Sequence, residues 1–374
     1  MTDGSPNLDL GLDLNLDLDY GPNLGAKTDY KIGAIGAGFI MKDVHLAAYR
    51  EAGFNVVAIA SRTRANAEAA AEQNGIATVH DTVAALLDDP RVEIVDIAYP
   101  PHEQLAIVKE LVTRPHIRGV LAQKPLATNL DEAREIVRLC EGAGKVLAVN
   151  QNMREDHAMR ALKTLLDRGD LGEPIVAQIT MHARPHWQGY VAGYDRVAIL
   201  NMSIHHLDVF RFLFGDPERI LTSVRTDPRT DFPHTDGMAF SILEYGFGLR
   251  AIALDNCFTW ADHGIEWRVE GTEGIAKGTL GWPDYPAGSP STINYLTRAD
   301  PETWHSPRWP EQWFPQGFIG TMAQLMIALE TGQEPAIGGR DNLGTMALIE
   351  AAYRSAETGA AVSPAQMLRG EIDG

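Results

Sequence analysis

The sequence predicts an α/β protein, with a doubly wound parallel sheet in its N-terminal part and an open, mostly antiparallel sheet in a C-terminal α/β domain. Two observations lead to this fold class. Strand-like and helix-like segments alternate from residue 30 to about residue 150, and this βαβ alternation is typical of a parallel sheet. After about residue 170, strand-like segments follow one another, which favours an antiparallel sheet with one open face.

The composition limits the possible partners. The chain has 374 residues, enough for two domains, and a formal net charge of −18. Such an excess of acidic residues argues against nucleic acid and anionic membranes as partners. No apolar run approaches the roughly 20 residues of a membrane span. With only two cysteines, Cys140 and Cys257, neither a disulfide framework nor a cysteine zinc site is expected, and a cytoplasmic location fits.

Residues 1–28 are interpreted as an acidic tail or arm. Leucine occupies every even position from Leu8 to Leu18, with aspartates between several of them. No basic region precedes an apolar core, so the segment is not a secretory signal. A disordered acidic tail or a remnant of cloning explains the pattern, and so does a strand-like arm that packs on a partner subunit.

The rest of the chain divides into two domains. Residues 29–150 are assigned to a dinucleotide-binding domain and residues 151–374 to a domain for substrate binding and oligomerisation. In the first, strands are expected at 30–35, 55–60, 94–98, 119–122 and 146–149, and helices at 39–52, 66–73, 102–113 and 131–141. In the second, strands are expected at 175–183, 220–226, 237–244, 249–254 and 266–270, and late helices at 318–329 and 342–358. A late helix can pack back on the first domain.

The first strand runs into GAIGAGFIM, residues 33–41. Gly36 and Gly38 are the first two glycines of G-x-G-x-x-G, while Met41 takes the third position. Because the motif lies between a strand and a helix of a βαβ unit, it predicts a Rossmann dinucleotide site. Gly36 permits the tight turn, Gly38 lets the backbone approach a pyrophosphate, and the helix that begins at Phe39 and Ile40 supplies amide donors.

The second strand ends in Ser61-Arg62-Thr63-Arg64. A site specific for NAD usually has an acidic residue here for the ribose hydroxyls, and none is present. Ser61 and Arg62 can instead bind a 2′-phosphate, which favours NADP over NAD. NAD stays open, because an arginine can also stack on adenine while NAD is bound.

The stretch VLAQKPLATN, residues 120–129, ends an apolar strand on Lys124 and Pro125. A buried lysine is costly unless it has a partner. The residue is therefore either a surface lysine at the start of a loop or a lysine aimed into a site. Ligands of open α/β sheets bind outside the carboxyl ends of the strands, and Lys124 stands at such an end.

Several motifs, taken in order, resemble the glucose–fructose oxidoreductase, inositol dehydrogenase and MocA (Gfo/Idh/MocA) family. They are GAGFI at 36–40, AYPPHEQ at 98–104, QKPLA at 123–127, LNMSIHHLD at 200–208 and VEGTEGIAKG at 269–278. The resemblance implies a Rossmann domain followed by an α/β domain whose open sheet commonly forms the subunit contact. It also implies oxidation or reduction of a secondary alcohol on a cyclic sugar or polyol with NAD or NADP, and a homo-oligomer, a dimer or tetramer.

The resemblance also gives Lys124 a role. Family members carry a Glu-Lys-Pro triplet whose lysine reaches the active site, and here the triplet is Gln123-Lys124-Pro125. The ammonium of Lys124 would stabilise developing alkoxide charge on the substrate. Pro100 and Gln123, from the matching motifs, join Lys124 as residues expected at the cofactor.

The helix expected within residues 200–215 contains two adjacent histidines. At helical spacing Asn201, His205 and Asp208 share one face, whereas His206 falls on a mostly apolar face and is expected to be a partly buried core histidine. The family helix carries Asp-x-x-x-His, and His205 matches its histidine, so His205 is the expected base. Asn201 replaces the family's aspartate, and an amide cannot stabilise an imidazolium as a carboxylate would. A structural polar cluster is the alternative.

The segment MHARPHWQGY, residues 181–190, is rich in groups that bind sugars. Aromatic faces pack against sugar C–H surfaces, and arginine or histidine can bind hydroxyls. Together with Asp208, the expected substrate contacts are Arg184, His186, Trp187 and Tyr190. The alternatives are a loop packed by its own aromatics or a subunit contact. A metal site is not expected, because Pro185 argues against the helix that would place His182 and His186 on one face.

The sequence therefore predicts an NAD(P)-dependent oxidoreductase that acts on a secondary alcohol of a cyclic sugar, polyol or glycoside. Lys124 polarises the hydroxyl and His205 accepts its proton. Two other functions stay open. One is glycoside cleavage through transient oxidation and elimination, and the other is a nucleotide-sensing protein without enzymatic activity.

Overall fold

The computed structural model describes residues 18–183, 189–281 and 289–371. Sheet A is built from β1 (Lys31–Ile35), β2 (Asn55–Ala60), β3 (Thr78–His80), β4 (Ile94–Ile97), β5 (Gly119–Ala122) and β6 (Val146–Val149). Its strands are all parallel, in the order β3-β2-β1-β4-β5-β6. This is the strand order of the doubly wound dinucleotide-binding fold.

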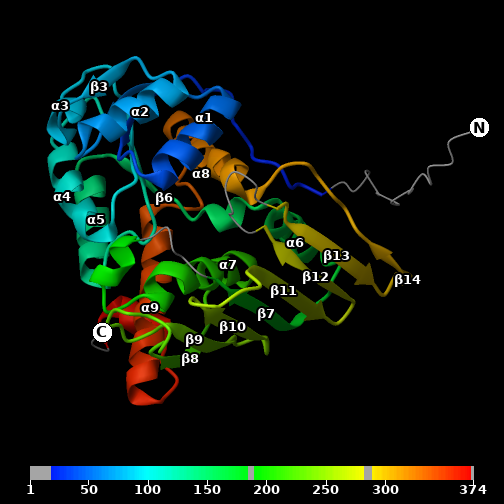
Figure 1. The fold of residues 1–374 in the computed structure, drawn as a ribbon. Helices are drawn as coiled ribbons and strands as arrows, with labels where there is room; N and C mark the ends of the chain where they lie inside the picture. Colours follow the sequence, from blue (N-terminus) through cyan, green and yellow to red (C-terminus); the bar gives the residue numbers. More distant parts are fainter. Residues whose placement is uncertain (1–17, 184–188, 282–288, 372–374) are drawn as a thin grey trace, which may run out of the picture.

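Helices cover both faces of sheet A (Figure 1). They are α1 (Leu46–Ala52), α2 (Arg64–Asn74), α3 (Val83–Leu87), α4 (Pro101–Leu111) and α5 (Leu130–Gly142). The predicted helix at 39–52 begins with a π-helical segment, η1 (Ile40–His45), before it continues as α1. The short elements β3 and α3 were not expected from the sequence, because three to five residues are too few for a periodic pattern.

Sheet B is the core of the second domain. Its strands are β7 (Pro174–His182), β8 (Arg219–Arg225), β9 (Met238–Glu244), β10 (Arg250–Asn256), β11 (Gly264–Gly271), β12 (Gly274–Leu280), β13 (Thr292–Thr297) and β14 (Asp300–His305). Their order is β14-β13-β12-β11-β7-β10-β9-β8, and only the β7–β10 pair is parallel. The predicted fold class, a parallel sheet followed by a mostly antiparallel one, is confirmed.

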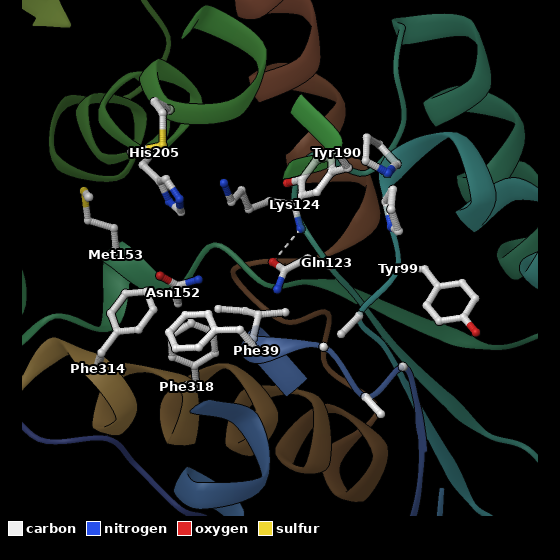
Figure 2. A pocket seen from close by; sticks show the side chains of 18 of the residues that line it. Phe39, Tyr99, Gln123, Lys124, Asn152, Met153, Tyr190, His205, Phe314 and Phe318 are labelled. Atoms are coloured by element: carbon white, nitrogen blue, oxygen red, sulfur yellow. Dashed lines mark hydrogen bonds between the residues drawn. The ribbon is translucent and has the colours of Figure 1, made fainter. Parts of the chain in front are cut away.

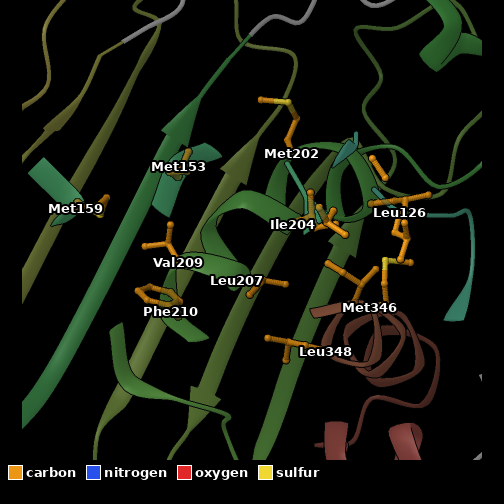
Figure 3. Close-up of a cluster of buried hydrophobic side chains, with 14 of the residues drawn as sticks. Leu126, Met153, Met159, Met202, Ile204, Leu207, Val209, Phe210, Met346 and Leu348 are labelled. Carbon is orange, nitrogen blue, oxygen red and sulfur yellow. The ribbon is translucent and has the colours of Figure 1, made fainter. Parts of the chain in front are cut away.

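The helices of the second domain are η2 (Asn152–Glu155), α6 (His157–Arg168), η3 (Gly189–Gly193), η4 (Ile199–Ser203), α7 (Ile204–Phe214), α8 (Trp313–Thr331), α9 (Gly339–Thr358) and α10 (Pro364–Arg369). Of these helices, α7 and α9 pack on sheet B, α9 also contacts α5 and β6 of the first domain, and α8 packs on sheet A (Figure 1). The buried side chains of α7 and α9 form one core with residues of both sheets, in which Leu126, Leu207 and Leu348 take part (Figure 3). The two sheets are thus held together by a continuous apolar core.

Helix α8 belongs to the last quarter of the chain yet packs on the first domain. Its residues Phe318, Met322 and Met326 are fully buried in the same cluster as Ile32 and Ile94 of sheet A. Because this helix also starts beside η2, it places its first turn at the junction of the two domains.

The described N-terminal residues pack on their own chain. Leu18 is buried in the main core, and the ring of Tyr20 stacks on Trp309 with ring centroids 4.9 Å apart. Asp19 forms an ion pair with Arg160 at 3.1 Å. Residues 1–17 lie outside the described residues. For Leu8–Leu16, both interpretations, a disordered acidic tail and an arm that packs on a partner subunit, therefore stay predictions. Among the described helices, none is long and apolar enough to cross a membrane.

Candidate active site

A cavity of about 350 Å³ lies where the carboxyl ends of the sheet A strands face the second domain. Its walls come from both domains (Figure 2). Every described residue that was expected to bind the cofactor lines it, and so do two further expected site residues. These residues are Gly36, Gly38, Phe39, Ile40, Ser61, Arg62, Pro100, Gln123, Lys124, Tyr190 and His205.

The glycine turn after β1 is shaped for a close ligand. Gly36 has a φ of 112°, and a Cβ at this position would lie 2.8 Å from the carbonyl oxygen of Ala98. Gly38 has open space where its Cβ would be. The next residues begin the helical segment η1–α1, whose first amides are directed toward the turn. The turn therefore fits the pyrophosphate of a dinucleotide.

The end of β2 carries the predicted adenosine-side residues. Arg62 lies over the ring of Tyr99, with its guanidinium carbon 5.4 Å from the ring centroid, and it forms an ion pair with Glu103 at 3.0 Å. Arg64 points elsewhere, because it pairs with Glu68 and does not line the cavity. Of the two arginines in SRTR, only Arg62 is placed to meet a cofactor.

Lys124 follows directly after β5 and extends into the cavity (Figure 2). Its ammonium donates a hydrogen bond to the main-chain carbonyl of Asn201 at 2.7 Å. Burial lowers the pKa of Lys124 from its ordinary value to about 7, because the charged form loses solvation. The interpretation as a surface lysine is therefore wrong, and the residue joins the end of sheet A to η4 of the second domain.

The turn that carries Lys124 is held by two glutamines. The side-chain amide of Gln104 donates to the carbonyls of Gln123 and Pro125, both at 2.8 Å. The Gln123 side-chain oxygen accepts the main-chain N–H of Lys124 at 2.9 Å. These bonds fix where the lysine leaves the sheet.

Gln123 also connects the lysine to a buried cluster in the first domain. Because its oxygen accepts from Lys124, its NH₂ group faces His45 Nε2 at 3.2 Å, which makes that nitrogen an acceptor. His45 Nδ1 then donates to Asp96 at 2.7 Å. Tyr49 donates to the same carboxylate at 2.6 Å. Nothing in the sequence motifs pointed to this cluster.

His205 lies on α7 and faces Lys124 across the cavity (Figure 2). Its ring meets the edge of Trp313, with centroids 5.8 Å apart. Burial and the neighbouring Lys124 and His206 lower the pKa of His205 well below its ordinary value. Its Nδ1 atom is buried and has no hydrogen-bond partner among the described residues. The imidazole is therefore neutral at pH 7, the form that accepts a proton.

Asn201 lies beside the cavity rather than in its lining. Its carbonyl oxygen accepts from Lys124, and its side-chain oxygen accepts from the Tyr190 hydroxyl at 3.3 Å. Together with Tyr190 it lines a smaller adjoining pocket. The prediction that Asn201 and His205 share a helix face assumed regular α-helical spacing. Ile199–Ser203 is instead π-helical, so Asn201 is rotated about the helix axis relative to its expected position. Asn201 holds Lys124 through its main chain.

Asp208 does not contact the cavity, and its prediction as a substrate residue is wrong. Its two oxygens accept a bidentate pair of hydrogen bonds from Arg154, both at 2.6 Å, and one also accepts from Thr345. Asp208 and Arg154 are both buried. The physical reason is Arg154, which follows β6 and needs a carboxylate once it is buried between the domains.

His206 is buried, as expected of a core histidine, but it also borders the cavity. Its Nδ1 lies 2.6 Å from the Asp255 carboxylate on β10. The pair ties α7 to sheet B and fixes the direction of both adjacent histidines.

The predicted sugar-binding segment is described only in part. Arg184, His186 and Trp187 lie outside the described residues. Tyr190, in η3, lines the cavity, and burial raises the pKa of its hydroxyl to about 12. Their roles as substrate contacts stay predictions.

Further lining residues were missed in the sequence. Asn152 follows β6 as Lys124 follows β5, so the rule that ligands bind beyond the carboxyl ends of strands could have found it. Trp313 and Phe314 belong to a proline- and tryptophan-rich stretch with no recognised role. Met153, Met181, Met202 and Ile265 form an apolar wall, and single apolar residues in separate elements give no pattern to detect.

Two family profiles match the chain. Residues 30–151 match the family described as "Oxidoreductase family, NAD-binding Rossmann fold". Residues 159–277 match the "GFO/IDH/MocA C-terminal domain". The two matches fall in sheet A and sheet B.

Named proteins are similar over most of the chain. D-apiose dehydrogenase of Paraburkholderia graminis is 29% identical over 89% of this chain and 89% of its own length. Inositol 2-dehydrogenase of Klebsiella pneumoniae is 30% identical over 66% of this chain and 73% of its own. The crystal structure of an Agrobacterium radiobacter oxidoreductase in complex with NAD+, L-tartaric acid and magnesium has a TM-score of 0.77, 26% identity, and covers 91% of this chain and 100% of its own.

The position of Asp208 leads to a testable prediction. Replacing Asp208 with Asn removes one charge of a buried pair and leaves Arg154 with Asp341 as its remaining carboxylate partner, so we expect the free energy of unfolding to fall by about 1.5–3 kcal/mol, the range for a hydrogen bond to a charged group. Cofactor affinity of the folded fraction stays unchanged. Urea denaturation followed by tryptophan fluorescence measures the first, and calorimetric titration the second. A substrate role would give the reverse, an unchanged denaturation midpoint and a raised KM.

Proposed function

This chain belongs to the Gfo/Idh/MocA family of NAD-binding oxidoreductases, and from that membership we propose that it transfers a hydride between a secondary alcohol of a cyclic sugar, polyol or glycoside and a nicotinamide cofactor. The substrate class is supported by relatives whose names specify a sugar, D-apiose, and a cyclic polyol, inositol. Because those names describe dehydrogenases, we do not propose cleavage by elimination or a sensing role.

The observation that carries the proposal is the pairing of Lys124 and His205 across one cavity with the glycine turn. The ammonium of Lys124 donates a hydrogen bond to the reacting oxygen and stabilises its developing negative charge. The neutral imidazole of His205 takes the hydroxyl proton. Bound nicotinamide supplies the carbon that accepts the hydride. The glycine turn, Phe39 and Pro100 are the residues that would hold that cofactor.

We predict that Lys124→Met lowers kcat strongly. Loss of one donor to a developing oxyanion costs roughly 100- to 1000-fold, and the methionine retains much of the apolar stem. His205→Ala also lowers kcat because it removes the proton acceptor. The measurement is cofactor absorbance at 340 nm with a panel of sugars and polyols.

Lys109→Met, on the exposed face of α4, is the matched control and keeps wild-type turnover. Near-normal turnover of Lys124→Met on a substrate that wild type oxidises would contradict the assignment of the site. Absence of hydride transfer by wild type with every sugar and polyol would contradict the proposed function itself.

We further propose that NADP is preferred over NAD, because Ser61 and Arg62 line the cavity at the end of β2 where an acid would select NAD. Arg62→Ala is expected to weaken NADP binding more than NAD binding. Arg64→Ala, which removes an arginine outside the cavity, serves as the control. Calorimetric titration of both cofactors measures the effect, and a clear wild-type preference for NAD would refute the prediction.

We also propose a cytoplasmic homo-oligomer that associates through the open face of sheet B. Leu221, Ile242 and Ile252 lie side by side across β8, β9 and β10, and each is about two fifths exposed. An apolar row of this kind favours a subunit contact. The free thiols Cys140 and Cys257 are compatible with a reducing compartment.

The oligomer is tested by Ile242→Lys, which places a charge in the centre of that row. Sedimentation velocity is expected to show dissociation into smaller species. Leu368→Lys, an equally exposed leucine on α10, leaves the assembly unchanged. A monomeric wild-type protein, or an Ile242→Lys protein that sediments as wild type does, would contradict the proposed contact.

A further inference from the structure

The described residues that line the cavity include no aspartate and no glutamate. Two cationic side chains, Arg62 and Lys124, line it, together with neutral polar and apolar groups. This contrasts with the whole chain, whose formal net charge is −18. Acidic residues are abundant in the protein and yet none of the described ones reaches the site.

Two polar residues that contact Lys124 are amides. Gln123 precedes Lys124 at the end of β5, and Asn201 lies on η4. Gln123 is a neutral amide. Its side-chain oxygen accepts a hydrogen bond from the main-chain N–H of Lys124, and its NH₂ group faces His45. Asn201, also a neutral amide, accepts a hydrogen bond from the Lys124 ammonium through its main-chain carbonyl.

The acidic groups nearest to these elements are each bound to another partner. Asp208 is paired with Arg154. Asp255 is paired with His206. Asp96 accepts from His45 and Tyr49. Among the described residues, no ion pair joins Lys124 to a carboxylate, and these three buried carboxylates are already bound to other groups.

An ammonium in this position needs an anion to balance it. Lys124 has three N–H donors, and one of them is used on the Asn201 carbonyl. Two donors remain for a ligand. An ammonium that has lost part of its solvation and has no counter-charge is unfavourable, and an anionic group beside it reduces that penalty. The apolar wall of Met181, Met202 and Ile265 strengthens the effect, because charges attract more strongly where water is excluded.

We propose that the substrate is an acidic sugar or polyol derivative, such as an aldonate or uronate, whose carboxylate binds the Lys124 ammonium beside the reacting hydroxyl. This inference rests on the proposed function, since it names the substrate class of the same site. The lysine uses one remaining donor for the alcohol oxygen and the other for the carboxylate. The substrate thus supplies the negative charge that Gln123 and Asn201 do not.

A pH dependence follows from the titratable groups around the lysine. His205 on α7 and Tyr190 on η3 both stay neutral between pH 7 and 9, because burial lowers the pKa of the first and raises that of the second. Lys124, with a pKa lowered to about 7, changes charge in that range. A bound carboxylate favours the ammonium, so affinity for the acid is full below pH 7 and falls by up to about tenfold per pH unit above it.

The first experiment compares matched neutral and acidic ligands with the same ring. D-glucuronate and D-glucose, and D-galacturonate and D-galactose, are tested as substrates and as ligands of the enzyme saturated with NADP or NAD. We expect kcat/KM, or calorimetric affinity, to be about tenfold or more higher for the acid of each pair. We also expect the acid's KM to rise between pH 7 and 9 while that of the neutral sugar does not.

The second experiment introduces a carboxylate at each of the two amide positions. Gln123→Glu and Asn201→Asp each supply a negative charge beside Lys124, so the advantage of the acid over its neutral partner should fall about tenfold or more. Because the readout is the ratio of two substrates on one enzyme, it is insensitive to a general loss of activity. Gln366→Glu, an exposed glutamine on α10, adds the same charge elsewhere and leaves the ratio unchanged.

The outcomes separate this inference from the proposed function. Neutral sugars turned over or bound as well as their acids, or a ratio that neither variant changes, would overturn the inference while hydride transfer remained. If neither acids nor neutral sugars are turned over, binding still decides: affinity for the acid that is no higher than for the neutral sugar overturns the inference. A preference for acids that both variants reduce would support it.

Discussion

The hydrogen bond from the Lys124 ammonium to the carbonyl of Asn201 is the contact on which the site depends. It joins the carboxyl end of β5 in sheet A to the π-helical turn that begins the α7 helix. The main chain around Lys124 is fixed by Gln104 and Gln123, so the direction of the lysine is set before any ligand binds. A lysine placed in this way loses solvation, and this loss lowers its pKa to about 7.

Other contacts fix the positions of the elements that form the two walls of the cavity. Arg154 reaches from the end of β6 to Asp208 on α7 and to Asp341 on α9, at 2.6 and 2.8 Å. Helix α8 packs on sheet A from the far end of the chain and brings Trp313 against His205. Helix α7, which carries His205, is therefore held to η2 by a buried ion pair and to α8, which packs on sheet A, by an aromatic contact.

The sequence allowed the prediction of the fold class and of the parts of the site that lie at strand ends. Gly36, Ser61 and Lys124 each follow a strand of sheet A, and the rule for ligands at carboxyl ends of parallel strands placed them correctly in one cavity. These positions could be predicted because a strand and the turn that follows it depend mainly on residues that are close in the sequence.

The prediction failed where tertiary contacts decide. Helical spacing placed Asp208 on the same face as His205, which predicted a site residue. In the folded chain its carboxylate instead binds Arg154, a buried residue 54 positions away in the sequence. The π-helical turn at Ile199–Ser203 shifted Asn201 out of the cavity lining, and no propensity marks such a turn in advance. His45 and Asp96, 51 residues apart, support Gln123 through contacts that only the folded chain reveals.

The two walls of the cavity have different physical character, and this divides chemistry from selection. The wall from sheet A includes main-chain turns and a lysine whose main chain is held by hydrogen bonds, so it fixes the position of the positive charge. The opposite wall, with Met181, Met202 and Ile265, is apolar and partly flexible, since methionine adapts its shape at little cost. Such a wall tolerates different ring outlines but offers few hydrogen bonds. Under the proposed function, discrimination between substrates would come chiefly from the charge of Lys124, because that interaction is strong in a cavity shielded from water. The proposed site would thus use one residue, Lys124, both to activate the alcohol and to select the molecule that carries it.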